Sequence, residues 1–343
     1  MIYPWCRETW AALQRQRATL HHALLVYGPR GIGKTEFARS FCQAQLCAKP
    51  DEAGSACGHC VDCHWFVQGS HPDFREIVPE ALAAESDAPV DTSADDGKAD
   101  KKAATQITVQ QVRDLQGFLA LTGHRPSGRR TILIQPAESM NVFADNALLK
   151  LLEEPPAGTV FLLVCADVRR LLPTIVSRCR KIAMPVPNRE TAAAWLREQG
   201  VREPQLFLAQ SGGAPLEALS LADPEYQLAR REFLTRLMNL VHAGAALELA
   251  ASAQKLALPL PLRWLTTWCH DLFRARLAGP IQYNLDFAEP IRTLAGKVEV
   301  DRLLLFEERL RVAAQSVNHP LNSRLFLEQL LLSYAQLQSP KWD

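Results

Sequence analysis

The amino-acid sequence predicts an α/β domain that is followed by helices alone, with a group of short helices between the two. Three observations predict this arrangement. Short apolar runs alternate with helical patterns over the first half of the chain. A glycine-rich loop connects the first of these runs to a helix, as in domains that bind phosphate groups. From residue 224 onward, the segments follow the apolar spacing of long amphipathic helices.

The composition is that of a globular protein with several domains. The chain has 343 residues, more than one hydrophobic core usually organises, with 48% hydrophobic and 22% charged residues. No apolar run reaches the length of a membrane span, and the first thirty residues lack the apolar core of a signal peptide, so we expect a cytoplasmic location. A net charge of +1 argues against tight, independent binding to nucleic acid.

The glycine-rich loop has the spacing of a phosphate-binding P-loop. It comprises Gly28, Pro29, Arg30, Gly31, Ile32, Gly33, Lys34 and Thr35. An apolar run at 23–26 precedes it as a strand, and a helix with Phe37 and Phe41 on one side follows it. Glycines let backbone N–H groups approach phosphate oxygens, Lys34 adds positive charge, and the Thr35 hydroxyl can hold magnesium. The loop therefore predicts a phosphate site, against the alternative of a simple glycine-rich turn.

Four of the nine cysteines form a metal-binding pattern. Cys47, Cys57, Cys60 and Cys63 have the spacing C-x9-C-x2-C-x2-C. Four thiolates at these separations can enclose a tetrahedral zinc ion, and Gly58 permits the tight turn that brings the sulfur atoms together. A closed site of this kind has no open position for water, so we predict a structural zinc module at 47–63. The remaining cysteines are scattered, as reduced thiols in a cytosolic protein tend to be.

Residues 80–106 are acidic and rich in alanine and offer almost nothing apolar to bury, so we predict a disordered insertion without an assigned function. Regular structure is predicted to resume at Thr108, where Thr108 and Gln111 have the spacing of a capping box at a helix start.

Two further buried strands are predicted at 131–134 and 160–164, with helices at 146–154 and 168–176. Alternation of this kind is typical of a parallel sheet, whose ligands bind at the carboxyl ends of the strands. The remaining predicted elements are an extended piece at 182–187, small helices within 189–221, and long helices at 226–241, 262–277, 301–316 and 323–337.

Five motifs, taken in order, resemble the bacterial clamp-loader branch of the AAA+ proteins. They are the P-loop, the four cysteines, Ser70-His71-Pro72-Asp73, the stretch Asn146–Pro156, and Ser177-Arg178-Cys179. The likeness is specific for residues 1 to about 221 and general for the helical remainder. It implies an AAA+ P-loop domain with the inserted zinc module at 1–167, a small helical lid domain at 168–222, and a C-terminal helical collar domain for oligomerisation at 223–343.

The resemblance also implies that this chain does not hydrolyse ATP. Hydrolysing members end the second conserved strand in Asp-Glu, which holds magnesium and orients the attacking water, whereas this chain has Gln135 and Pro136 there. Glu138 lies off the strand end and is a poor substitute. The two sensor positions hold Cys165-Ala166 and Leu216 instead of polar and cationic residues. The intact P-loop remains compatible with ATP or ADP bound as a structural ligand without hydrolysis.

Arg178 is the catalytic element that the resemblance retains. In the family, the arginine of Ser-Arg-Cys reaches across a subunit boundary to the γ-phosphate held by a neighbour, where its charge stabilises the transition state. The alternative is that Arg178 pairs with a carboxylate at a helix end of its own chain.

The resemblance therefore predicts a non-hydrolysing, arginine-donating clamp-loader subunit of the DNA polymerase III assembly in DNA replication, and no polymerase or other enzyme activity in the chain by itself. Its implied partners are the gamma/tau and delta subunits, the sliding clamp and, through the complex, primed DNA. One alternative is an active ATPase of the gamma/tau type, against which Gln135 and Pro136 argue. Another is a stand-alone zinc-dependent nucleic-acid binder, whose basic residues are few: Arg125, Arg129, Arg130 and Lys150.

Overall fold

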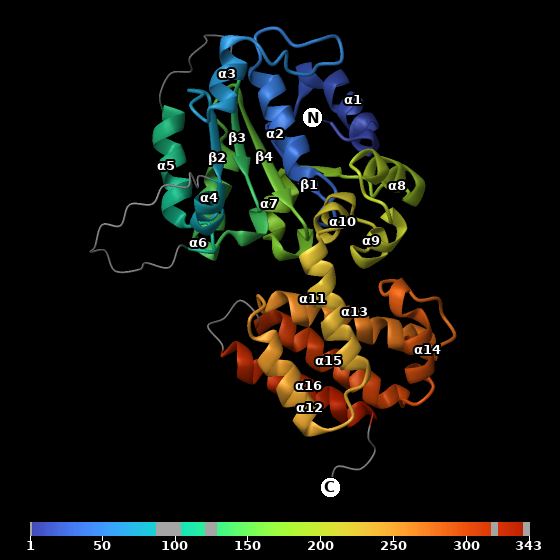
Figure 1. The fold of residues 1–343 in the computed structure, drawn as a ribbon. Helices are drawn as coiled ribbons and strands as arrows, with labels where there is room; N and C mark the ends of the chain where they lie inside the picture. Colours follow the sequence, from blue (N-terminus) through green and yellow to red (C-terminus); the bar gives the residue numbers. More distant parts are fainter. Residues whose placement is uncertain (1, 87–103, 121–128, 317–321, 339–343) are drawn as a thin grey trace, which may run out of the picture. The chain divides into compact units, whose positions relative to one another are not determined.

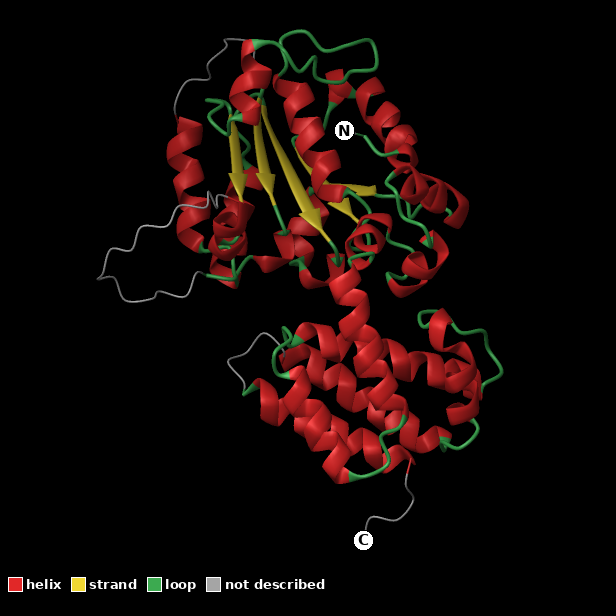
Figure 2. Ribbon diagram, viewed as in Figure 1, coloured by secondary structure: helices red, strands yellow, loops and turns green. Residues whose placement is uncertain are grey.

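The computed structural model describes residues 2–86, 104–120, 129–316 and 322–338 (Figure 1). It forms two compact units, Met1–Pro187 and Asn188–Asp343. The first unit contains the strands together with helices, and the described part of the second contains helices (Figure 2). Each unit is described by itself below.

The first unit is built on a parallel sheet of five strands in the order β2-β3-β4-β1-β5. The strands are β1 (Ala23–Tyr27), β2 (Phe74–Ile77), β3 (Arg130–Ile134), β4 (Thr159–Cys165) and β5 (Arg180–Ala183). The strands predicted at 23–26, 131–134 and 160–164 are confirmed as β1, β3 and β4. Because all strands are parallel, their carboxyl ends meet at one edge, where ligands bind in sheets of this kind.

Helices cover both faces of this sheet (Figure 1). They are α1 (Arg7–Arg15), α2 (Lys34–Leu46), α3 (Val61–Val67), α4 (Glu80–Ser86), α5 (Val109–Ala120), α6 (Val142–Glu153) and α7 (Pro173–Arg178). Successive side chains of a strand point to opposite faces. Ile132 and Ile134 of β3 therefore share one core with α5, α6 and α7. On α2, Phe37 and Phe41 are buried and meet the edge of the Trp10 ring.

The start of α5 confirms the predicted capping box. The Thr108 backbone N–H donates to Gln111 Oε1 at 2.9 Å, and the Gln111 N–H donates to Thr108 Oγ1 at 3.4 Å. The reciprocal pair satisfies two N–H groups that a helix start leaves without intrahelical partners.

The prediction of a disordered insertion at 80–106 was wrong for its first residues, because residues 80–86 form the helix α4. Alanines in this segment favour a helix, and Pro79 accepts its first backbone hydrogen bonds. The Ala81 N–H donates to the Ala104 carbonyl at 3.1 Å, so the far end of the insertion is also fixed. Residues 87–103 lie outside the described part of the chain.

The boundary predicted between 167 and 168 was also wrong. A 3-10 turn at Val168–Arg170, α7 and β5 all belong to the first unit, which extends to Pro187. The physical reason is backbone pairing, since Leu24 to Tyr27 of β1 align with Arg180 to Ala183 of β5. The further division at 222/223, between a lid and a collar, stays a prediction.

The second unit contains helices with buried apolar faces. They are α8 (Arg189–Glu198), α9 (Pro204–Gln210), α10 (Pro215–Leu221), α11 (Pro224–Met238), α12 (Ala243–Ala253), α13 (Pro259–Arg276), α14 (Ala288–Ala295), α15 (Val300–Ser316) and α16 (Ser323–Gln338). At its centre, the buried Trp268 indole donates to the hydroxyl of Tyr334 at 2.8 Å. Among the described residues, no helix combines the length and the apolar composition that a membrane span requires.

Candidate nucleotide site and cysteine cluster

The P-loop residues Gly28 to Thr35 connect the end of β1 to the start of α2, as predicted. Gly33 has a φ of +88°, in the left-handed region that favours glycine, directly before the first helical residue. A Cβ at Gly33 would also lie 2.4 Å from Cδ2 of Tyr3. Both the backbone conformation and the packing therefore require glycine at this position.

Lys34 lies largely buried at the start of α2, with 8% of its surface exposed. Its Nζ donates a hydrogen bond to the carbonyl of Pro29 at 2.6 Å, so the side chain closes over its own loop. Burial lowers the pKa of Lys34, and the negative charge of Glu138 opposes that effect. Thr35 is exposed, which leaves its hydroxyl available to a ligand.

Two aromatic residues that the sequence analysis did not single out hold the P-loop in place. The Trp5 indole N–H donates to the Ile32 carbonyl at 2.9 Å. The Tyr3 ring packs against Gly33 and stacks on Trp5, with ring centroids 5.0 Å apart and planes 3° apart. The two aromatic residues of Tyr3-Pro4-Trp5 are visible in the sequence. They lie some 25 residues before the loop, however, and a local sequence pattern does not predict a contact over that separation.

Gln135 and Pro136 follow directly after the last residue of β3. The Gln135 Nε2 donates to Glu76 Oε1 at 2.5 Å, and Glu76 also pairs with Arg39 at 2.9 Å. Gln135 therefore connects the end of β3 to the neighbouring strand β2. Pro136 has no acidic group.

Glu138 lies on a 3-10 turn at Ala137–Ser139. Its Oε1 accepts a hydrogen bond from the Ala166 N–H, just beyond the end of β4, at 3.0 Å. The turn therefore returns the carboxylate to the edge of the sheet. Cys165 is the last residue of β4, and burial raises the pKa of its thiol to about 12, which keeps this group neutral.

Arg178 is the last residue of α7, and its side chain is 36% exposed. One guanidinium nitrogen lies 2.5 Å from Glu153 Oε1, at the end of α6, and another donates to the Thr174 carbonyl at 3.0 Å. The structure thus shows the local carboxylate pairing that the sequence left open as an alternative. Both partners in these contacts belong to helices of the same chain, Glu153 to α6 and Thr174 to α7.

The four predicted cysteines converge. Their sulfur atoms all lie within 4.8 Å of one another. Cys47 Sγ is 3.6 Å from that of Cys57 and 3.9 Å from that of Cys60, and Cys57 Sγ is 4.0 Å from that of Cys63. A tetrahedron with metal–sulfur bonds of about 2.3 Å has edges of about 3.8 Å, so the cluster has the size that a zinc ion needs. A backbone hydrogen bond from His59 lowers the pKa of Cys57, whereas burial raises the pKa values of Cys47 and Cys63.

A buried polar pair connects the cysteine cluster to the sheet. Asp62 Oδ1 lies 3.6 Å from His71 Nε2, and both side chains are at most 3% exposed. Asp62 Oδ2 is 3.9 Å from Cys60 Sγ, while His71 Nδ1 accepts the backbone N–H of Asp73 directly before β2. The Ser70–Asp73 motif therefore ties the cluster to the edge of the sheet.

Two of the basic residues considered for nucleic-acid binding make hydrogen bonds within the first unit. Arg129 donates to Gln45 Oε1 at 2.6 Å and to the Arg17 carbonyl, and Arg130 donates to the Leu119 carbonyl. Arg125 lies outside the described residues, and Lys150 is exposed on α6. The arrangement gives no support to a stand-alone nucleic-acid binder.

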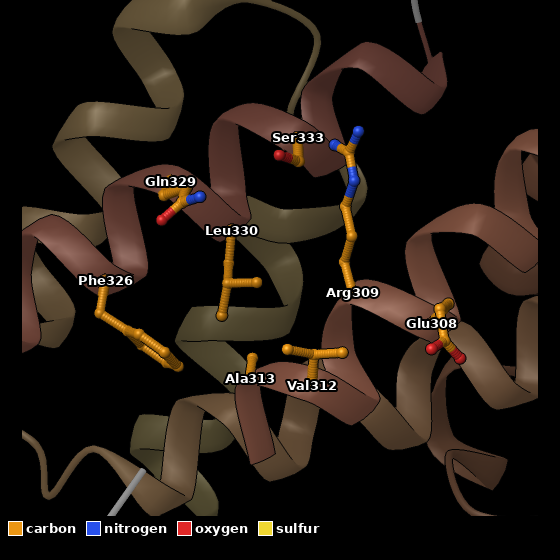
Figure 3. A pocket seen from close by; sticks show the side chains of 8 residues that line it. All are labelled: Glu308, Arg309, Val312, Ala313, Phe326, Gln329, Leu330 and Ser333. Carbon is orange, nitrogen blue, oxygen red and sulfur yellow. The ribbon is translucent and has the colours of Figure 1, made fainter. Parts of the chain in front are cut away.

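The second unit contains a pocket of about 560 Å³ between α15 and α16. Its lining residues are Glu308, Arg309, Val312, Ala313, Phe326, Gln329, Leu330 and Ser333. Phe326 and Leu330 point toward Val312 and Ala313 across it (Figure 3). The apolar centre and polar rim suit an apolar side chain rather than a phosphate group.

Comparisons with known proteins match both units of the chain. Residues 7–188 match the family described as "DNA polymerase III, delta subunit", and residues 224–336 match "DNA polymerase III, delta subunit, C terminal". The chain is 36% identical to DNA polymerase III subunit delta' of Pseudomonas aeruginosa, over 99% of each chain. It is 29% identical to subunit delta' of Escherichia coli, over 88% of this chain and 85% of that one. Subunit tau of Salmonella typhimurium is 32% identical over 60% of this chain and 29% of its own length.

Proposed function

This chain belongs to the delta-prime family of DNA polymerase III subunits, and on that premise we propose that it is a non-hydrolysing subunit of a clamp loader in DNA replication. It binds ATP or ADP without turnover and lends Arg178 to a neighbouring ATPase subunit. It is not an enzyme by itself, and polymerase activity belongs to the assembly.

The non-hydrolysing role is supported by the two residues that follow β3, Gln135 and Pro136, because neither is acidic. Gln135 is neutral, and its amide nitrogen donates to Glu76, so it cannot serve as the acid that activates water. Loss of a catalytic acid commonly lowers turnover by orders of magnitude. The alternative, an active ATPase of the gamma/tau type, would show steady-state ATP turnover by the purified chain that Lys34→Ala abolishes.

The exposure and the weak local contacts of Arg178 support its role in a neighbouring site. Both Arg178 and its partner Glu153 are partly exposed, at 36% and 51%. Exposed pairs of this kind are worth only about 0.2–1 kcal/mol, so a phosphate group offered by another subunit would compete effectively for the guanidinium. The local pair is therefore compatible with an arginine that exchanges partners on assembly.

The size and composition of the cysteine cluster support a structural zinc ion. Cys47, Cys57, Cys60 and Cys63 would hold it, and four thiolates would leave it no open position for chemistry. The ion would fix the segment between α2 and α3 and, through Asp62 and His71, its attachment to β2.

The helices of the second unit are proposed to join a hetero-oligomer with gamma/tau and delta subunits, which together act on the sliding clamp and primed DNA. Apolar residues exposed on α15 and α16 support such a surface: Leu305 is 66%, Val312 52% and Leu325 61% exposed. Burial of such side chains against a neighbouring subunit would stabilise the assembly.

Native mass spectrometry of the chain mixed with gamma/tau and delta subunits tests this proposal. We expect a hetero-oligomer that contains this chain, and a chain that stays at its own mass of 38.2 kDa would contradict the proposal. Leu305→Asp should weaken incorporation. Leu247→Asp on α12, where the leucine is also exposed, is the matched control and should assemble normally.

A further inference from the structure

Three neighbouring strands place their carboxyl ends at the nucleotide site. β3, β4 and β1 are adjacent in the sheet. β1 leads through the P-loop to Lys34, β4 ends directly before Ala166, and β3 is followed by the turn that carries Glu138. The hydrogen bond between the Ala166 N–H and Glu138 Oε1, at 3.0 Å, fixes the carboxylate at this edge.

One oxygen of this carboxylate has no protein partner. Oε2 of Glu138 is buried, and no hydrogen bond reaches it from the described residues. A buried charged oxygen without a partner is unfavourable, so the site favours a cation there. Lys34 does not fill this role. Although Glu138 raises the pKa of Lys34 more than any other charge does, the lysine donates to the Pro29 carbonyl.

Oε2 of Glu138 has the chemistry of a magnesium ligand. Magnesium bound with a nucleotide typically takes one or two carboxylates from the protein, phosphate oxygens and waters. Thr35 supplies the hydroxyl of the P-loop, and Gln135 and Pro136 contribute no carboxylate. We propose that Oε2 of Glu138 binds the magnesium ion of a nucleoside phosphate held by residues 28–35. The inference rests on the nucleotide binding in the proposed function.

Under this proposal Glu138, which lies off the strand end in the sequence, binds the metal ion while the chain stays non-hydrolysing. Hydrolysing relatives need two acids, one for the metal and one for the attacking water. Here Gln135 and Pro136 supply no acid directly after the strand, and the other oxygen of Glu138 is held by the Ala166 N–H. Glu138 can therefore hold the ion, while the position that supplies the water-orienting acid in hydrolysing relatives holds Pro136.

The magnesium dependence of ADP binding by the full chain tests the proposal. Binding of an ADP carrying a fluorescent methylanthraniloyl group is titrated in magnesium and in EDTA. We expect wild-type affinity to be about tenfold higher in magnesium, the effect of one charge-assisted contact. Glu138→Gln keeps the side-chain size and an oxygen for the Ala166 N–H, and it should bind equally well in both conditions.

Glu36→Gln is the matched control, because Glu36 lies in the first turn of α2 and also raises the pKa of Lys34. It should retain the magnesium effect. Binding in EDTA verifies that Glu138→Gln is folded, and Glu138→Asp, which keeps the charge, should recover part of the effect. The proposal would be overturned if Glu138→Gln kept the wild-type dependence of ADP affinity on magnesium. It would also be overturned if magnesium did not change the ADP affinity of the wild-type protein. Absence of any nucleotide binding would also overturn it, while the subunit proposal would still be decided by native mass spectrometry.

Discussion

Gln135 and Glu76 meet across two neighbouring strands, where the Gln135 amide donates to the Glu76 carboxylate at 2.5 Å. The same carboxylate pairs with Arg39 of α2 at 2.9 Å. Gln135 is thus part of a contact that joins β2, the end of β3 and α2. An aspartate at position 135 would instead place two carboxylates side by side in a largely buried site.

The first prediction concerns this pair. Gln135→Asp should lower the free energy of unfolding at pH 7 by about 2 kcal/mol, because a like charge replaces a hydrogen-bond donor. Urea unfolding at pH 7 and pH 4.5 measures the effect. The loss should shrink at the lower pH, because protonation of one carboxylate removes the repulsion. The double variant Glu76→Gln with Gln135→Asp restores a donor and an acceptor and should recover most of the stability. Equal losses in the single and double variants would contradict this explanation.

The periodic elements of the fold were predictable, and the exceptions have local causes. Continuous apolar runs located β1, β3 and β4, and the capping pair located α5. The helices α12 and α14 were missed. α12 is dominated by alanines, which give little contrast between its faces, and α14 has only eight residues. The helix predicted at 168–176 is divided into a 3-10 turn and α7, because Pro173 starts a new helix at its first position.

Sequence spacing predicted the parts of the site that are contiguous in the chain. The P-loop and the four cysteines were found because each motif has its own spacing. Tyr3, Trp5 and Glu138 reach the site through tertiary packing, which spacing does not encode. Glu138 in particular depends on how the turn after β3 is directed toward Ala166.

The second prediction concerns the cysteine cluster. The purified protein should contain one zinc ion per chain, and Cys60→Ser should release it and lower the free energy of unfolding by about 3 kcal/mol or more. Plasma emission spectrometry and thermal unfolding measure the two effects. Because protons compete with metal for the thiolates, zinc should be lost as the pH falls. His59→Ala is the control, since His59 is an exposed neighbour of the cluster, and it should keep its metal. A wild-type protein without zinc would remove the premise.

The third prediction concerns Asp145 on α6, whose pKa is raised by burial from 3.8 to about 6. The folded state binds this proton more tightly than the unfolded state does. Stability should therefore fall as the pH rises from about 4 to about 6. Asp145→Asn should remove this fall and stabilise the protein at pH 7 by up to about 2 kcal/mol, with little effect at pH 4. Urea unfolding across this range measures it, and the exposed Asp114→Asn is the control. Destabilisation by Asp145→Asn at pH 7 would show that the charge is favourable.

The fourth prediction separates the two roles open to Arg178. In a complex reconstituted with partner subunits, Arg178→Ala should lower ATP hydrolysis at the site it serves by roughly 10²–10³-fold and leave assembly intact, because a stabilising charge is lost from the transition state. Steady-state turnover and native mass spectrometry measure the two effects. Glu153→Gln removes the local partner and should not lower turnover. Arg169→Ala, an arginine that is 90% exposed and paired with Asp167, is the control. If Glu153→Gln reproduces the loss seen in Arg178→Ala, the arginine acts through its own chain, and the role in a neighbouring site is excluded.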